Sequence, residues 1–313
     1  MTLTELRYVV ALSQERHFGN AARRCFVTQP TLSLALAKLE EELGLRLFER
    51  NKNEVIVTPA GEGIVEQARR VLDEAAKIPA MAKGRRDPLE GALRLGVIPT
   101  IGPYLLPSLI PALRRRAPRM PLAIEENFTG NLAPMLREGE IDCAIVALPF
   151  VVPGVETRAL YEEPFRVVVP EGHPWAKKKR VRGDELVAED LLVLNAGHCF
   201  REQVLEACPG QSNTASPEGR SGSSLETIRN MVASGLGVSV LPAMALEAPF
   251  GTTKLVREIA FADPVPSRKV AIAWRASFAR PEAVEAVAKA VAESRLAGVK
   301  PLAAQGRRSA PGG

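Results

Sequence analysis

Two of the four cysteines in this 313-residue chain, Cys199 and Cys208, lie nine positions apart in the segment NAGHCFREQVLEACPG. The residues between them, FREQVLEA, are almost all strong helix formers. A helix would separate the two Cα atoms by roughly 13 Å, at about 1.5 Å per residue, whereas a disulfide tolerates Cα separations up to about 7 Å. A strand would separate them further. The pair is therefore either inert or part of a segment that refolds when it is oxidised.

The residues around Cys199 suit attack on a peroxide. The nucleophile is the thiolate rather than the thiol, and Cys199 opens the helix-forming run, where the positive end of the helix dipole favours an anion. His198 and Arg201 are adjacent donors for the thiolate, for the peroxide oxygens or for the leaving hydroxide. Attack would give a sulfenic acid at Cys199, which condenses with a second thiol. On spacing alone, however, two ordinary helix cysteines are the better interpretation.

The composition is typical of a soluble globular protein of about two domains, with 46% hydrophobic and 25% charged residues. A net charge of +5 and a pI of about 9.1 permit a polyanionic partner without requiring one. We find neither a signal peptide nor an apolar run long enough to span a membrane. The irregular cysteine spacing argues for the cytoplasm, where a disulfide is more often a switch than a staple. The three histidines show no metal-ligand spacing, so we expect no metal and no cofactor.

Residues 1–58 have the pattern of a winged helix-turn-helix. TELRYVVALSQE and HFGNAARRCF predict two helices, and VTQPTLSLALAKLEEELGLRLFER predicts a turn and a longer helix capped by Thr28. The apolar stripe of that helix is Leu32, Leu36, Leu39 and Leu43. LFERNKNEVIVTPAG is typical of a small β-wing. A small helical bundle with no role in DNA binding is the alternative interpretation.

The start of the third helix is the part of such a unit that usually meets base edges, and flanking basic residues meet phosphates. Leu34 lies in the same first turns. The predicted DNA-binding residues are Arg23, Gln29, Pro30, Thr31, Ser33, Lys38, Arg50 and Lys52.

AGEGIVEQARRVLDEAAKI predicts a long helix after the wing. Its apolar residues alternate steps of four and three, as in a coiled-coil seam: Ile64, Ala68, Val71, Ala75 and Ile78. Packing of this helix on its own domain is the alternative. Pro79 is expected to end or kink it, because proline removes a hydrogen bond and clashes with the preceding turn. The polar stretch KGRRDPLEG, 83–91, is the expected domain boundary.

From residue 92 onward, predicted strands and helices alternate. GALRLGVIP, DCAIVALP and FRVVVPEGHP are typical of buried strands, and LLPSLIPALRRRAP and NLAPMLREG of helices. SLETIRNMVASGLGVSVLP predicts a helix, a glycine turn and a strand. This alternation favours a parallel α/β sheet. The predicted domains are 1–58 for DNA binding, 59–90 for a linker and dimerisation helix with a hinge, 91–300 for an α/β regulatory domain, and 301–313 for a disordered tail.

The motifs HFGNAARRCFVTQPTLSLALAKLEEELGLRLFER and VTPAG strongly resemble the DNA-binding unit of the LysR-type regulators. IPTIGPYLLPSLIP, GHCFREQVLEAC, EGHPWA and SLETIRNMVASGLGVSVLPA resemble the peroxide-sensing OxyR type within that family, so the resemblance covers almost all of the chain. Gly-His-Cys with its second cysteine is the discriminating feature. The resemblance implies a winged helix-turn-helix, a linker helix, and an α/β regulatory domain of two subdomains similar to periplasmic binding proteins.

The same resemblance implies roles for individual residues and partners. Cys199 would be the peroxidatic thiol and Cys208 the resolving thiol of a reversible disulfide. Thr100 and Thr129 match residues that hold peroxide in relatives, and Arg268, in PSRKVAIAW, is a weaker match near the same pocket. The implied partners are promoter DNA, RNA polymerase, hydrogen peroxide as signal, three further copies in a dimer of dimers, and a thiol reductant such as glutaredoxin or thioredoxin.

If the helix between the cysteines forms, a bridge requires it to unwind or move, which disturbs Val204 and Leu205 and repositions the DNA-binding units. Two other functions compete with a peroxide switch. One is a LysR-type regulator that binds a small effector in the regulatory cleft, with incidental cysteines. The other is a thiol peroxidase fused to a DNA-binding unit, which is disfavoured because a slowly recycling switch needs only one oxidation per signal.

Overall fold

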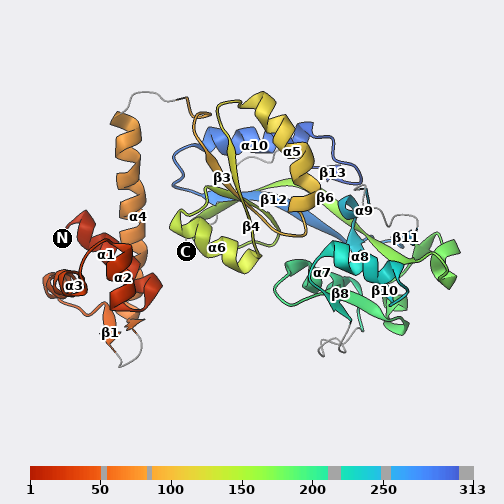
Figure 1. Cartoon of the computed structure of the whole chain (residues 1–313), viewed down its shortest axis with the longest axis horizontal. Helices are drawn as coiled ribbons and strands as arrows, with labels where there is room; N and C mark the ends of the chain where they lie inside the picture. The colour runs from red at the N-terminus through yellow and green to blue at the C-terminus, as the bar shows by residue number, and fades with distance from the viewer. Residues whose placement is uncertain (51–54, 83–86, 211–219, 248–254, 303–313) are drawn as a thin grey trace. The chain divides into compact units, whose positions relative to one another are not determined.

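The computed structural model describes residues 1–50, 55–82, 87–210, 220–247 and 255–302. The chain divides into two compact units, Met1–Arg86 and Asp87–Gly313 (Figure 1). Among the described helices, none combines the length and apolarity needed to cross a bilayer. The finer division at 58, 90 and 300 stays a prediction, and the expected tail lies outside the described residues from 303 onward.

The first unit is the predicted winged helix-turn-helix. Its three helices are α1 (Leu3–Glu15), α2 (Phe18–Arg24) and α3 (Gln29–Leu43), followed by an antiparallel wing of β1 (Phe48–Arg50) and β2 (Val55–Val57). Each helix begins at a side-chain cap: Thr2 for α1, His17 for α2 and Thr28 for α3. The predicted stripe of α3 faces the core, with Leu32, Leu36 and Leu39 each at most 1% exposed.

Helix α4 (Pro59–Ala82) follows the wing, and its first half packs on its own unit. Val65 and Ala68 are buried, and Ile64 and Val71 lie partly buried against the same core. The first half of α4 therefore follows the alternative interpretation, in which the helix packs on its own domain. Ile78, the last residue of the predicted seam, is 63% exposed, and pairing with a second copy stays a prediction.

We expected Pro79 to end or kink α4. It does not end the helix, which continues through it to Ala82, and a kink stays a prediction. Pro79 lies in the last turn of the helix. A proline there removes a single backbone hydrogen bond, so the turn tolerates it.

The second unit contains one long mixed sheet. In its first half β3 runs parallel to both β4 and β5, and in its second half β8 runs parallel to both β9 and β10. These strands are β3 (Leu93–Val97), β4 (Leu122–Glu126), β5 (Cys143–Ala147), β8 (Leu191–Leu194), β9 (Ser221–Gly222) and β10 (Val238–Pro242). Cys143 is fully buried, as expected for a core residue.

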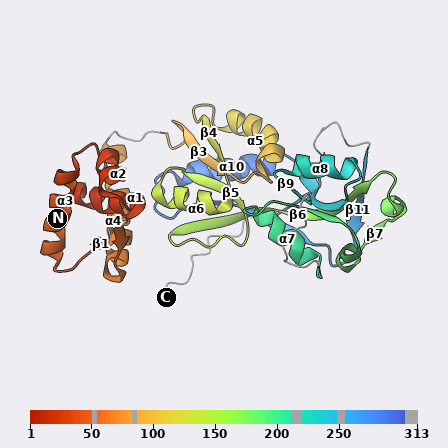
Figure 2. The same ribbon diagram turned by 60° about the horizontal axis from the view of Figure 1, so that its bottom comes forward.

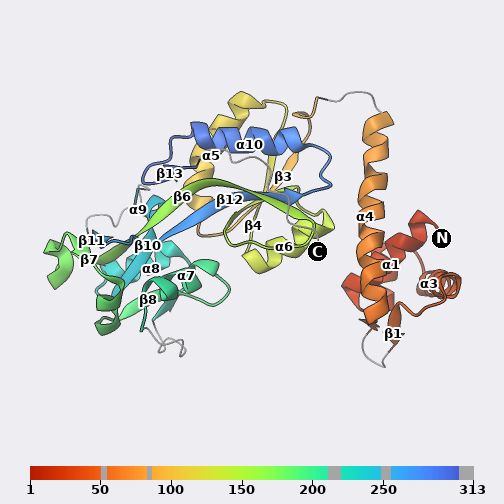
Figure 3. The ribbon, with the colours of Figure 1, turned by 180° about the vertical axis from the view of Figure 1, so that it is seen from behind.

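Two long strands join the halves, β6 (Val155–Pro170) and β12 (Ser267–Arg275). They pair with each other antiparallel, and Figure 3 shows them running side by side from one half into the other. The sequence predicted a parallel sheet, but β6 pairs antiparallel with β10, β11 (Val256–Phe261) and β12, and β12 pairs antiparallel with β5. The alternation of strands and helices is a local pattern. It could not predict that β6 and β12, which are distant in sequence, would pair with each other and join the two halves of the sheet.

Helices cover both halves of this sheet (Figures 1 and 2). In the first half α5 (Gly102–Arg116) packs against α10 (Pro281–Glu293), and α6 (Thr129–Glu138) packs near β5 and β12. In the second half α7 (Cys199–Ala207) and α8 (Leu225–Ala233) both pack on β8. The remaining elements are η1 (Pro174–Lys177), β7 (Arg180–Val181), η2 (Gly183–Ala188), α9 (Ala243–Glu247), β11 (Val256–Phe261) and β13 (Lys300–Pro301).

Candidate redox site

Cys199 is the first residue of α7 and Cys208 caps its C-terminal end, and both are free thiols. The predicted helix between the cysteines is therefore confirmed, and at about 1.5 Å per residue it holds the two Cα atoms roughly 13 Å apart. Phe200 and Val204 anchor the helix in the core at 1% and 3% exposure. Cys208 itself is fully buried, whereas Cys199 is partly exposed. Burial raises the pKa of the Cys208 thiol to about 12.

Cys199 lines a small, closely packed pocket. Three chain segments form this pocket, and they follow β3, β4 and β8. The carboxyl ends of parallel strands are where α/β sheets usually bind ligands. The lining residues are Ile98, Pro99, Thr100, Phe128, Thr129, Gly197, His198 and Cys199.

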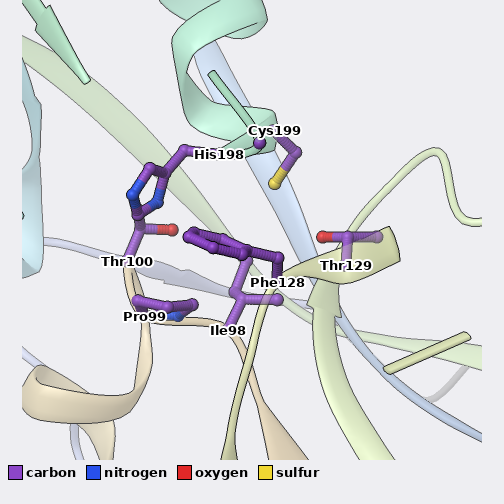
Figure 4. A pocket seen from close by; sticks show the side chains of 8 residues that line it. Ile98, Pro99, Thr100, Phe128, Thr129, His198 and Cys199 are labelled. Atoms are coloured by element: carbon purple, nitrogen blue, oxygen red, sulfur yellow. The ribbon is translucent and has the colours of Figure 1, made fainter. Parts of the chain in front are cut away.

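Three side chains with a hydroxyl or thiol group line this pocket: Thr100, Thr129 and Cys199. Figure 4 shows the Cys199 sulfur and the Thr129 hydroxyl oxygen turned toward each other, and the Thr100 hydroxyl oxygen turned toward the Phe128 ring, which lies between Thr100 and Cys199 in this view. Phe128 stands edge-on to the His198 ring, with 4.7 Å between ring centroids. The structure thus brings together four of the residues that the sequence selected: Thr100, Thr129, His198 and Cys199.

The His198 ring, which lines the pocket, is left with one buried acceptor nitrogen. Its Nε2 lies 3.1 Å from the Ser223 carbonyl oxygen, and because a carbonyl only accepts, Nε2 carries the proton. Burial lowers the pKa of His198, so the ring is neutral near pH 7 and Nδ1 is an acceptor. Nδ1 is buried and has no hydrogen-bond partner among the described residues. The sequence had predicted a donor here, and the distant Ser223 carbonyl reverses that role.

Arg201 and Arg268 do not line the pocket that the sequence assigned to them. Arg201 Nη1 donates to the Leu194 carbonyl at 2.8 Å and so holds α7 to the end of β8. Arg268 lies behind Thr100, where its Nη1 donates to Thr100 Oγ1 and its Nη2 to the Thr100 carbonyl, both at 2.8 Å. Arg268 therefore reaches the site through Thr100 rather than directly.

Sequence reasoning missed two residues of this region. Phe128, next to the selected Thr129, lines the pocket and packs on His198. An aromatic residue among the polar residues that follow a strand was the feature of the sequence that could have indicated its role. Glu163 accepts from Arg268 Nε at 2.8 Å, and the pair is 105 residues apart. No local pattern could have found it. Among the described residues, no group of His, Cys, Asp or Glu is arranged to hold a metal ion.

Most of the predicted DNA-binding residues lie at the surface of the first unit, on α2 and α3. Arg23, Gln29, Pro30, Thr31 and Lys38 are exposed, and Ser33 is partly buried. Arg50 belongs to β1, but its side chain lies outside the described part of the chain, as does all of Lys52.

The fold and the two units define a helix-turn-helix regulator with an α/β sensing unit. Residues 3–62 match the bacterial regulatory helix-turn-helix proteins of the lysR family, and residues 86–295 match the LysR substrate binding domain. The chain therefore belongs to the LysR family of regulators and, by the relatives that follow, to its OxyR type.

Curated relatives match over nearly the whole chain. The hydrogen peroxide-inducible genes activator of Dickeya chrysanthemi is 38% identical over 309 residues, covering 97% of this chain and 99% of that protein. The DNA-binding transcriptional dual regulator OxyR of Escherichia coli K12 is 38% identical over 291 residues, covering 93% and 95%.

Solved structures agree with this assignment. A full-length OxyR variant from Pseudomonas aeruginosa has a TM-score of 0.76 and 51% identity, covering 97% of this chain and 99% of that one. An H2O2-bound OxyR mutant from Corynebacterium glutamicum has a TM-score of 0.63 and 36% identity, covering 94% and 92%.

Proposed function

We propose that this protein is a hydrogen-peroxide-sensing, DNA-binding transcriptional regulator in which Cys199 is oxidised and then forms a reversible disulfide with Cys208. The observation that carries the proposal is the position of Cys199. It lies at the start of α7 in a pocket with Thr100, Thr129 and His198, while Cys208 is buried at the other end of the same helix.

The pocket can hold a peroxide by complementary hydrogen bonds. Because Arg268 donates to Thr100 Oγ1, the Thr100 hydroxyl hydrogen is left to donate to a peroxide oxygen. Nδ1 of His198 can accept a hydrogen of the same peroxide, since Nε2 carries the ring proton. The described side chains pack closely around this space, so we expect only a ligand as small as peroxide to enter it.

The redox steps balance without a cofactor. The Cys199 thiolate attacks one peroxide oxygen, the O–O bond breaks, and the departing hydroxide takes up a proton and leaves as water. Cys199 is then a sulfenic acid. The Cys208 thiolate attacks its sulfur, the S–O bond breaks, and a second water leaves as the disulfide forms. A dithiol reductant such as glutaredoxin or thioredoxin would return both thiols.

The disulfide requires α7 to open, because a bridge tolerates about 7 Å between Cα atoms and the helix sets roughly 13 Å. Opening would withdraw Phe200 from its packing against Phe165 of β6, where the ring centroids are 5.1 Å apart. β6 runs through both halves of the second unit, so repacking at Phe165 would reach surfaces beyond the site. This makes α7 the bistable element that a switch needs.

The wider assembly follows from the family. We propose a cytoplasmic homotetramer, built as a dimer of dimers, that binds promoter DNA and contacts RNA polymerase. We also propose that it is not an enzyme, because a switch needs one oxidation per signal. Support comes from the names of its relatives, which are activators of peroxide-inducible genes.

The test compares wild type with Cys199→Ser by promoter footprinting before and after stoichiometric H2O2. We expect Cys199→Ser to keep the footprint of the reduced form and to lose the peroxide-dependent change. Cys25→Ser, at a free thiol in the first unit, is the matched control and should respond like wild type. A Cys199→Ser variant that still responds to peroxide would contradict the proposal and favour a small-molecule effector. The side chains around Cys199 leave no room for a drug-sized ligand, which needs a cavity of roughly 300 Å³ or more, and this disfavours that alternative.

A further inference from the structure

We propose that Glu163 is a positioning residue for the peroxide reaction. It would act through Arg268 to fix the Thr100 hydroxyl as a donor in the pocket that Cys199 also lines. This inference rests on the proposed function, and it concerns a residue outside the pocket lining.

Glu163 and Arg268 form a buried ion pair between the two strands that join the halves of the unit. They are directly opposed cross-strand partners on β6 and β12, and each side chain is 1% exposed. Arg268 Nε and Nη2 both lie 2.8 Å from Glu163 Oε2. The second carboxylate oxygen, Oε1, accepts from the Met244 backbone N–H at 2.9 Å. The carboxylate is therefore held on both oxygens.

The pair fixes the plane of the guanidinium. A buried guanidinium without a counter-charge would be strongly disfavoured, so Glu163 offsets the cost of burying the Arg268 charge at this position. One face of the guanidinium lies over the Phe200 ring, 5.1 Å from its centroid. Phe200 directly follows Cys199 at the start of α7, so Arg268 also touches the helix that carries the reactive thiol.

The remaining donors of Arg268 form a fork on Thr100. Nη1 donates to the hydroxyl oxygen and Nη2 to the carbonyl of the same residue. A hydrogen bond from a charged donor is roughly twice as strong as a neutral one, and it fixes the hydroxyl oxygen from behind. The hydroxyl hydrogen is then free to point away from Arg268, on the side where Figure 4 shows the Thr100 oxygen turned toward Phe128, another residue of the pocket lining. Without Glu163, the two hydrogen bonds from Arg268 to Thr100 would no longer be held in this orientation.

The experiment measures the second-order rate constant of Cys199 oxidation by H2O2 in the full-length protein, with peptide mass spectrometry to isolate Cys199. The same samples are alkylated with iodoacetamide. The alkylation rate reports the accessibility and the thiolate content of Cys199, and it does not depend on the orientation of a bound peroxide. Glu163→Gln should lower the H2O2 rate constant by about tenfold or more, since small misplacements of orienting groups cost such factors. The iodoacetamide rate should change far less, so the ratio of the two rates falls.

Asp142→Asn is the matched control. Asp142 is also a buried carboxylate, it accepts from the Arg94 guanidinium and backbone N–H, and it does not line the pocket. Its ratio of rates should equal that of wild type. In a Thr100→Val background, adding Glu163→Gln should lower the H2O2 rate no further, because the residue through which Glu163 acts has lost its hydroxyl.

The outcomes separate the two proposals. A wild-type Cys199 that reacts with H2O2 no faster than N-acetylcysteine would refute the proposed function itself. A fast wild type with an unchanged ratio in Glu163→Gln, or an equal loss in Asp142→Asn, would overturn only the role of Glu163. If Glu163→Gln does not fold, Glu163→Asp keeps the charge and shortens its reach, and it should show the same fall in ratio. Failure of both variants to fold would mark a purely structural pair and overturn the inference.

Discussion

Cys199 and Cys208 stand at the two ends of one helix, one thiol facing a pocket and the other fully buried. Two separate barriers therefore oppose a bridge between them in the reduced protein. The helix keeps their Cα atoms roughly 13 Å apart, and burial raises the pKa of Cys208 to about 12, which keeps it a thiol. Opening of α7 would remove both barriers at once, since it brings Cys208 to solvent as well as toward Cys199.

The burial of Cys208 predicts a specific loss of stability at alkaline pH. Its folded-state pKa is raised from 9.0 to about 12, so between these values the unfolded chain has lost a proton that the folded chain keeps. The stability from the buried thiol is complete below pH 9 and falls as the pH rises toward 12. Urea unfolding of the reduced protein at pH 8 and pH 10.5 measures this. The free energy of unfolding should fall more for wild type than for Cys208→Ala, and equal falls would contradict the burial of this thiol.

A substitution at Gly183 should destabilise the C-terminal end of α7 while both cysteines are kept. A Cβ at Gly183 would overlap the carbonyl oxygen of Ala207, the last residue of α7. Gly183→Ala should therefore push the end of the helix outward and destabilise the reduced form by about 1–3 kcal/mol. The measurement is the rate at which Cys208 reacts with a thiol reagent under reducing conditions, which we expect to rise.

Gly172→Ala is the control for that experiment, because a Cβ there meets nothing within 4 Å. Its Cys208 should react as slowly as in wild type. A Gly183→Ala protein in which Cys208 stays equally unreactive would show that this contact does not restrain the helix.

We predict that Leu34 makes an apolar contact with DNA. It lies in the first turns of α3 and is 74% exposed, among polar exposed neighbours. An apolar side chain at such a position suits the 5-methyl group of thymine in the major groove. We expect Leu34→Ala to weaken binding to a selected operator severalfold. Replacing the contacted thymine by uracil should weaken wild type by a similar factor and leave Leu34→Ala unchanged.

Leu3→Ala removes an exposed leucine from α1 and serves as the control, with wild-type affinity expected for both operators. Equal sensitivity to uracil in wild type and Leu34→Ala would place the methyl contact elsewhere.

Local signals predicted the parts of this protein that local interactions determine. The helix between Cys199 and Cys208, the Thr28 cap and the buried stripe of α3 follow from helix propensity, capping and periodicity within a few residues. The mixed sheet could not be predicted in this way, because β6 and β12 pair across about a hundred residues. The sequence of either strand by itself does not indicate which strand it pairs with.

The site shows the same limit. Thr100, Thr129, His198 and Cys199 were selected from their own motifs, and the pocket brings them together. The acceptor role of His198 depends on Ser223, 25 residues away. The position of Arg268 depends on Thr100, 168 residues away, and on Glu163. The role of each of these side chains therefore depends on a partner that only the folded chain brings close. Such a partner cannot be found from the spacing of residues within a motif.

Amide hydrogen exchange across residues 199–208, measured by mass spectrometry before and after stoichiometric H2O2, tests the switch most directly. In the reduced protein the amides of α7 should be protected by the helix, and in oxidised wild type they should exchange rapidly while the Cys199–Cys208 peptide appears as a disulfide. Cys208→Ser should keep its protection after the same treatment. A disulfide between Cys199 and Cys208 in a protein whose α7 amides remain as protected as before would contradict the account.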